Sequence, residues 1–71
     1  MTQITTVSKK LGQRVRKIRE DKGVTQEQLA LNAGLNRAYI GYIERGERNP
    51  STEVISKLAK ALRVPIHELF K

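Results

Sequence analysis

Apolar residues recur at helical spacing along most of this chain. Leu11, Val15 and Ile18 stand four and three positions apart, which places them on one face of a helix. Comparable apolar groups occupy four later segments: residues 26–33, 36–45, 51–62 and 66–70. No stretch of the sequence alternates between apolar and polar residues as a half-buried strand does. The pattern therefore predicts an all-α fold of five helices joined by short connections.

Residue types suited to helix ends separate these segments. Thr25, with Gln28 three positions later, forms a capping box at the start of the second helix. Asn36 and Ser51 are suitable N-caps for the next two helices. The first three helices are each expected to end at a glycine, which readily adopts the left-handed conformation found there: Gly23, Gly34 and Gly46.

The composition limits what kind of protein this is. With 71 residues, the chain suffices for one small domain, which we expect over residues 9–71 behind a flexible N-terminal arm of residues 1–8. The sequence has no cysteine and one histidine, so we expect no disulfide, no metal site and no cofactor. Its apolar runs are too short to cross a bilayer, and its polar start does not resemble a signal peptide. We therefore expect a cytoplasmic protein.

The chain is strongly basic. Fourteen Lys and Arg face seven Asp and Glu, which gives a net charge of +7. Half of these cations lie between Lys9 and Lys22. Such an excess favours a polyanionic partner. On charge alone, a nucleic acid, a membrane surface and a merely solvated basic face all remain open.

The connection between the second and third segments is the most informative local feature. Only Gly34-Leu35-Asn36 joins them, too few residues for an antiparallel pair of long helices, so the two helices have to cross steeply. Ala30 is small enough for the crossing point, and Gly34 adopts positive φ at little cost. Apolar residues spaced to fill the angle between the helices are Leu29, Leu35, Ile40 and Ile43. Together these features match a helix-turn-helix; two ordinary packed helices are the alternative.

The helix expected over residues 36–45 has two different faces. At 100° per residue, Ile40 and Ile43 fall on the inner side. Ala38 and Tyr42 fall opposite them, together with an arginine at position 45 and a glycine at position 41. The outer face therefore combines small residues, which allow close approach, with hydrogen-bond donors.

Such a face suits the major groove of B-DNA, which admits a helix and presents acceptors on guanine and methyl groups on thymine. We expect Arg37, near the start of the helix, to bind guanine in a bidentate manner. Ala38 is expected to pack on a thymine methyl, and Tyr42 to contact a base edge or a phosphate. Gly41 either permits close approach to the DNA or is merely tolerated in the helix, and the residues alone leave both readings open.

Phosphate contacts are expected from the edges of this surface: Gln26, Asn36, Tyr39, Arg45 and Asn49. Gln26 opens a helix, whose first N–H groups and dipole favour an anion. For Tyr39, packing against the domain with the hydroxyl turned outward is the alternative. Arg48, in the loop after the helix, can clamp a phosphate or reach into a groove.

Glu44 is the unusual residue of the third helix, because its position points toward the inner side. A half-buried carboxylate needs a partner. Arg19, late in the first helix, is the expected one, and a solvated glutamate is the alternative.

The C-terminal segment VPIHELF holds more apolar residues than so thin a core buries easily. A single recognition helix reads few base pairs, whereas a two-fold dimer reads a palindrome with half-sites about one helical turn apart. We therefore expect a homodimer seam in residues 64–71, formed by four residues: Val64, Ile66, Leu69 and Phe70. The alternative, for one or two of them, is that they close the monomer's own core.

Several motifs resemble a known family. The strings TQEQLA, YIGYIERGERNPS and KLAKAL, within a match over nearly the whole chain after the arm, resemble the phage-repressor-like (Xre-type) helix-turn-helix family. The resemblance implies a compact five-helix, lambda-repressor-like domain whose third helix enters the major groove. It implies a phosphate-binding role for Gln26 and an ion pair between Arg19 and Glu44. It also implies base reading by three residues of the third helix: Arg37, Ala38 and Tyr42.

Within this family, the motif NRAYIGYIERGERNPS is most similar to the controller proteins of restriction–modification systems. That similarity implies a small dimeric regulator that activates the endonuclease gene and limits its own expression, with Arg48 also reading bases. The expected partners are double-stranded DNA with a palindromic operator, a second copy of the chain and RNA polymerase, and neither a membrane nor a small-molecule ligand. An antitoxin-type repressor of a toxin–antitoxin operon is the alternative. An enzyme is not expected, because the sequence holds no catalytic constellation.

Overall fold

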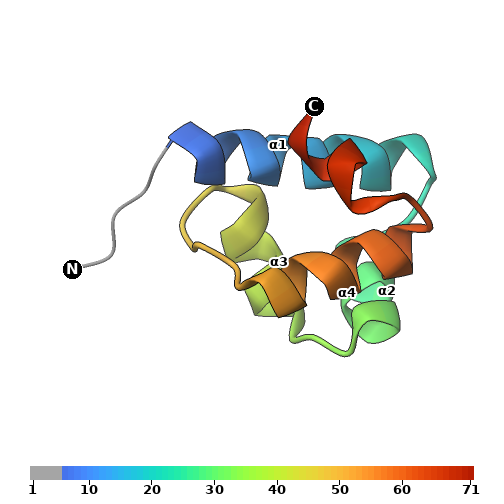
Figure 1. Cartoon of the computed structure of the whole chain (residues 1–71). Helices are drawn as coiled ribbons and strands as arrows, with labels where there is room; N and C mark the ends of the chain where they lie inside the picture. Colours follow the sequence, from blue (N-terminus) through green and yellow to red (C-terminus); the bar gives the residue numbers. More distant parts are fainter. Residues whose placement is uncertain (1–5) are drawn as a thin grey trace.

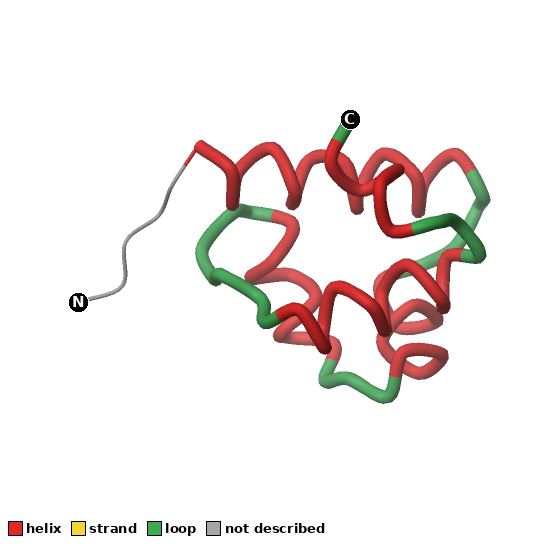
Figure 2. Tube along the Cα trace, in the orientation of Figure 1, coloured by secondary structure: helices red, strands yellow, loops and turns green. Residues whose placement is uncertain are grey.

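The computed structural model describes residues 6–71, which form helices and the loops between them (Figure 1). It contains four α-helices and a terminal 3-10 helix: α1 (Thr6–Asp21), α2 (Gln26–Ala33), α3 (Arg37–Glu44), α4 (Thr52–Leu62) and η1 (Ile66–Phe70). Figure 2 shows the short loops that join them, and no strand in this part of the chain. The predicted all-α fold is confirmed, with the fifth helix a single 3-10 segment. No helix within residues 6–71 is long and apolar enough to span a membrane.

Helix α1 begins earlier than the sequence pattern predicts. Its first residue is Thr6, so the prediction of an arm through residue 8 is wrong for residues 6–8. The reason is that Ser8 is buried, and its hydroxyl donates a hydrogen bond to Oδ1 of Asn49 in the loop before α4. This contact anchors the first turns of α1 to the rest of the domain. The remainder of the predicted arm, residues 1–5, lies outside the described residues.

The N-caps lie where the sequence predicts them. The Thr25 hydroxyl accepts a hydrogen bond from the Gln28 N–H at 3.0 Å, and the Gln28 side chain accepts one from the Thr25 N–H at 2.9 Å. Asn36 caps α3 by accepting from the Ala38 N–H at 2.7 Å, and Ser51 caps α4. These bonds satisfy N–H groups that the start of a helix otherwise leaves unpaired. The capping residues thus fix where α2, α3 and α4 begin.

The core lies between α1 and the other helices. α1 packs on α3 and η1, while α2 packs on both α3 and α4 (Figure 1). Leu29, Ile40 and Leu58, from three different helices, are fully buried. The outer face of α3, which includes Tyr42, is exposed to solvent.

Helices α1 and α3 meet at Gly12. A Cβ atom on this residue would stand 2.8 Å from the backbone oxygen of Glu44, and closer still to that of Ile43. Real Cβ atoms essentially never approach backbone so closely. Glycine at position 12 therefore allows the α1 backbone to touch the C-terminal end of α3 and sets how the two helices pack.

Helix η1 closes the core, which corrects one assignment made from the sequence. η1 packs on α1 and α4, and its Leu69 is 0% exposed. A side chain with no accessible surface in the monomer has none left to bury against a second copy. The assignment of Leu69 to the dimer seam is therefore wrong, and the alternative, that it closes the monomer's own core, is correct.

Candidate nucleic-acid interface

Helix α3 divides its side chains between core and solvent. Ile40 and Ile43 are 0% and 1% exposed, so one face is sealed against the other helices. Arg37, Ala38 and Tyr42 are all exposed. The division matches the one that helical spacing predicts, and it leaves an open surface of small, aromatic and cationic side chains.

The turn before α3 has the geometry of a helix-turn-helix. Gly34 adopts the left-handed conformation, with φ 68°, and the Leu35 N–H reaches back to the Ala30 carbonyl at 2.8 Å. Ala30 is 4% exposed, and Leu29 is completely buried beside it. The tight turn and the small residue together let α2 and α3 cross closely, as the motif requires.

Glu44, at the end of α3, is buried and hydrogen-bonded on both carboxylate oxygens. It accepts bonds from Arg19 Nε at 2.7 Å, from Arg19 Nη2 at 3.1 Å and from the Gln26 amide at 3.0 Å. Arg19 also donates to the Val24 carbonyl at 2.8 Å. The hydrogen bond with Glu44 raises the pKa of Arg19 above its ordinary value, and burial opposes that shift. The expected Arg19–Glu44 pair is thus present and joins α1 to α3, with α2 attached through Gln26.

Gln26 and Arg37 line the same hollow, where the ends of α1, α2 and α3 meet. Its volume is about 480 Å³, and Thr25 and Glu27 lie on its wall as well. The bond to Glu44 orients the Gln26 amide at the start of α2, beside the helix N–H groups that favour an anion. The structure therefore brings together one residue expected to bind phosphate and one expected to read a base.

Glu27 is a neighbour of Arg37 that the sequence pattern does not reveal. Its Oε1 lies 3.7 Å from Arg37 Nε, and both side chains are mostly exposed. Ten positions separate the two residues, and only the crossing of α2 and α3 brings them together. An exposed ion pair of this kind contributes little energy. Arg37 can therefore exchange Glu27 for another acceptor at small cost.

A second cluster forms where α3 ends. The guanidinium carbons of Arg45 and Arg48 lie over the Tyr42 ring, 5.2 Å and 4.9 Å from its centroid. Arg45 Nε also lies 3.2 Å from Oε1 of Glu47. The fold thus gathers Tyr42, Arg45 and Arg48, three residues proposed from the sequence, and adds Glu47, which was not singled out.

The three other residues expected at phosphates have structural contacts of their own. Asn36 uses its side-chain oxygen to cap α3, and the Asn49 side-chain oxygen accepts the hydrogen bond from Ser8. Tyr39 is half-buried and packs against the core. Their contacts with phosphate remain predictions.

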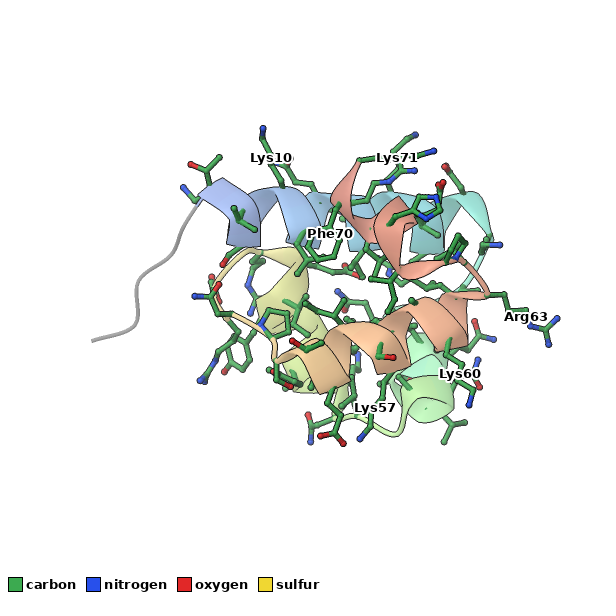
Figure 3. The ribbon with its side chains drawn as sticks, viewed as in Figure 1. Lys10, Lys57, Lys60, Arg63, Phe70 and Lys71 are labelled. Atoms are coloured by element: carbon green, nitrogen blue, oxygen red, sulfur yellow. The ribbon has the colours of Figure 1, made fainter. Side chains whose placement is uncertain are left out.

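Three of the four proposed seam residues have accessible surface. Ile66 and Phe70 are 45% and 52% exposed, and Val64 is half-buried. Phe70 lies with Lys10 and Lys71 on the wall of a hollow of about 420 Å³ between α1 and the C-terminal end (Figure 3). Phe70 is therefore an exposed apolar patch with a cationic border.

Glu68 fastens η1 to α1 beside this patch. Arg14 donates from Nε to the Glu68 carbonyl at 2.7 Å, and its Nη2 lies 3.2 Å from Oε1 of the carboxylate. Lys71 Nζ lies 2.7 Å from the other carboxylate oxygen. The hydrogen bond from Lys71 contributes most to lowering the pKa of Glu68, with smaller contributions from Arg14 and His67. These contacts hold the backbone that presents Ile66 and Phe70.

Within the part of the chain described, no group of three or more His, Asp or Glu side chains is placed to hold a metal ion. The geometry so far is that of a helix-turn-helix with a cationic outer surface. A family model described as helix-turn-helix matches residues 15–69, most of the chain.

The chain belongs to the phage-repressor-like (Xre-type) helix-turn-helix family. One relative is the control protein C.BamHI of Bacillus amyloliquefaciens, 49% identical over 59 residues that cover 82% of this chain and 73% of that protein. An HTH-type transcriptional regulator of Mycobacterium tuberculosis is 42% identical over 59 residues, 83% of this chain but 42% of that protein, so the chain spans less than half of that relative.

A solved structure, that of the restriction–modification controller protein C.AhdI from Aeromonas hydrophila, has a similar fold. It superposes with a TM-score of 0.87 and 51% sequence identity, covering 89% of this chain and 96% of that one. The family assignment and the fold therefore agree.

Proposed function

We propose that this protein is a sequence-specific regulator of transcription that binds double-stranded DNA with α3 in the major groove. The observation that carries the proposal is the division of α3. Its isoleucines are sealed in the core, whereas Arg37, Ala38 and Tyr42 form an open face. Arginine donors suit guanine acceptors, and the Ala38 methyl suits the thymine methyl. Arg48, in the following loop, is proposed to read bases beside them.

Phosphate binding is proposed to come from both ends of this face. At one end, the start of α2 presents Gln26 together with the positive end of the helix dipole, which favours an anion. At the other end, Arg45 and Asn49 are proposed to bind phosphate from the end of α3 and the loop after it, and Asn36 and Tyr39 are proposed to contribute as well. The net charge of +7 adds a salt-dependent attraction that does not depend on base sequence.

The protein is proposed to act as a homodimer on a palindromic operator. One recognition helix reads too few base pairs for specificity in a genome, and a two-fold dimer doubles the site. Val64, Ile66 and Phe70 supply accessible apolar surface for the seam.

The cellular role that fits best is that of a restriction–modification controller, which activates the endonuclease gene and limits its own expression. Similarity to C.BamHI and C.AhdI supports this role, and contact with RNA polymerase is part of it. Genes for a methyltransferase and an endonuclease beside this one would agree with it. A toxin-sized neighbouring gene would instead favour an antitoxin-type repressor.

Selection of bound duplexes from a random pool tests the proposal directly. We expect enrichment of one palindrome with half-sites about one helical turn apart. Enrichment without two-fold symmetry would contradict the dimer, and no enrichment at all would contradict sequence-specific binding. Footprinting on the gene's own upstream region then tests autoregulation, because a controller is expected to protect a site there.

A further inference from the structure

Tyr42 is in contact with two cations. The guanidinium carbons of Arg45 and Arg48 lie 5.2 Å and 4.9 Å from the centroid of its ring, within the range of cation–π attraction. Helix α3 ends at Glu44, so Arg45 belongs to the helix end and Arg48 to the loop beyond it. One aromatic ring on the exposed face therefore links the end of the helix to the loop that follows.

Gly41 leaves the space in which Arg45 lies. A Cβ atom on Gly41 would stand 3.1 Å from Nη1 of Arg45, tighter than an ordinary van der Waals contact. Gly41 is buried although it is on the outer side of α3, because the Arg45 guanidinium covers it. Glycine at position 41 thus leaves room for the Arg45 side chain, independently of any contact between α3 and DNA.

Glu47 compensates the charge of this arrangement. Two guanidinium groups over one ring repel each other, and the Glu47 carboxylate lies 3.2 Å from Nε of Arg45. Both partners of that pair are about half exposed, so it does not hold Arg45 by itself. Arg45 is instead held by three features together: the space at Gly41, the Tyr42 ring and the Glu47 carboxylate.

We infer that Tyr42 is a positioning residue: its ring aligns Arg45 and Arg48 so that their donors meet the acceptors of DNA in a fixed geometry. This inference rests on the proposed function. It assigns the effect of Tyr42 to its ring and not to its hydroxyl, in contrast to direct contact of the hydroxyl with a base or a phosphate. Arginine side chains lose much rotamer freedom when they bind. Stacking before binding reduces that loss, and it couples the helix to the loop.

The test compares two substitutions of the same residue. Tyr42→Phe keeps the ring and removes the hydroxyl, whereas Tyr42→Leu removes the ring. In the free protein, we expect the ring current of residue 42 to shift the Nε–H and Cδ–H resonances of Arg45 and Arg48 in the wild type and in Tyr42→Phe but not in Tyr42→Leu. Gly41→Ala is expected to disturb the Arg45 resonances alone.

The second measurement is affinity for the selected palindrome and for a random duplex. We expect Tyr42→Phe to stay within about twofold of the wild type, and Tyr42→Leu to lose about tenfold on the palindrome. On random DNA the loss in Tyr42→Leu is expected to be smaller, because both charges remain. Base preference is expected to relax at the pairs that Arg48→Ala also affects, whereas Arg45→Ala is expected to weaken binding to both duplexes. Thermal unfolding checks that each variant is folded.

The outcomes separate this inference from the proposed function. Equal losses in Tyr42→Phe and Tyr42→Leu would show that the hydroxyl contacts DNA, and would overturn the positioning role while leaving DNA binding intact. Arginine resonances that do not respond to Tyr42→Leu would overturn it as well. A wild-type protein with no preference for any duplex would overturn the proposed function, and the positioning role with it.

Discussion

Arg37 is the residue for which base reading has the clearest consequence. It stands exposed at the start of α3, and its present partner, Glu27, holds it only weakly across 3.7 Å. We expect Arg37→Ala to weaken binding to the selected operator by ~1–3 kcal/mol and to relax preference at one base pair. Titrations against the operator and its single-pair variants measure both effects.

The control for Arg37 is Lys60→Ala, which removes an exposed cation from α4 (Figure 3). It lowers the net charge by the same amount, and we expect only a small, sequence-independent loss of affinity. If Arg37→Ala behaved in the same way on operator and random DNA, Arg37 would be a phosphate clamp and not a base reader.

At the scale of helices and loops, Gly12 sets how α1 and α3 pack. A methyl group there would collide with the backbone oxygens of Ile43 and Glu44, and backbone cannot move aside as a flexible side chain can. We expect Gly12→Ala to reduce the free energy of unfolding by about 1–3 kcal/mol, despite the better helix propensity of alanine. Urea denaturation measures the change, with Gln13→Ala as the exposed neighbour that should be nearly neutral. An unchanged midpoint for Gly12→Ala would show that the two helices separate without cost.

The Glu68 carboxylate helps to attach η1 to α1, and its titration is expected to make the stability of the protein depend on pH. The pKa of Glu68 lies below the ordinary 4.5, mainly because Lys71 donates a hydrogen bond to it, with Arg14 and His67 adding to the shift and desolvation opposing it. A lowered folded-state pKa means that this stabilisation is present above the unfolded pKa and is lost as pH falls through the folded one. We therefore expect Glu68→Gln to flatten the loss of stability below about pH 4.5. If the free energy of unfolding fell equally steeply with pH in the wild type and in Glu68→Gln, this prediction would be contradicted.

How much of this architecture the sequence predicts depends on the range of the interactions involved. The caps at Thr25 and Asn36 and the inward isoleucines follow from spacing along a single helix, so they could be predicted. The Arg19–Glu44 pair could also be predicted, because a carboxylate on the inner side of a helix requires a cation. These features depend on local geometry or on one obligatory partner.

Other features depend on how distant segments meet, and single-sequence patterns do not contain that information. The extension of α1 to Thr6 depends on Ser8 reaching Asn49, 41 positions away. Leu69 lies in the core because η1 folds back onto α1 and α4. Three apolar residues of η1 look alike in the sequence: Ile66, Leu69 and Phe70. Only the way in which η1 packs on α1 and α4 decides that Leu69 is the buried one.

At the scale of the whole molecule, the remaining apolar surface at the C-terminal end bears on assembly. Ile66 and Phe70 are about half exposed, and Phe70 is bordered by Lys10 and Lys71. We expect Phe70→Ala and Ile66→Ala to shift the protein toward monomer in sedimentation experiments, because each removes apolar area from the seam. Leu31→Ala is the matched control, since Leu31 is also exposed and apolar but lies on α2, whereas η1 packs on α1 and α4. A dimer unaffected by Phe70→Ala and Ile66→Ala would remove the proposed seam.

The lysines beside Phe70 allow a second, independent test of the same dimer seam. In a two-fold dimer whose axis passes close to Phe70, the Lys10 side chains of the two copies would lie near each other, and their like charges would oppose association at low salt. Added salt screens this repulsion and should tighten the dimer, whereas the same salt weakens DNA binding by competing at the phosphates. Sedimentation and operator titrations over one salt series should therefore change in opposite directions. Dimer affinity that falls with salt would instead indicate a seam held by ion pairs on some other face.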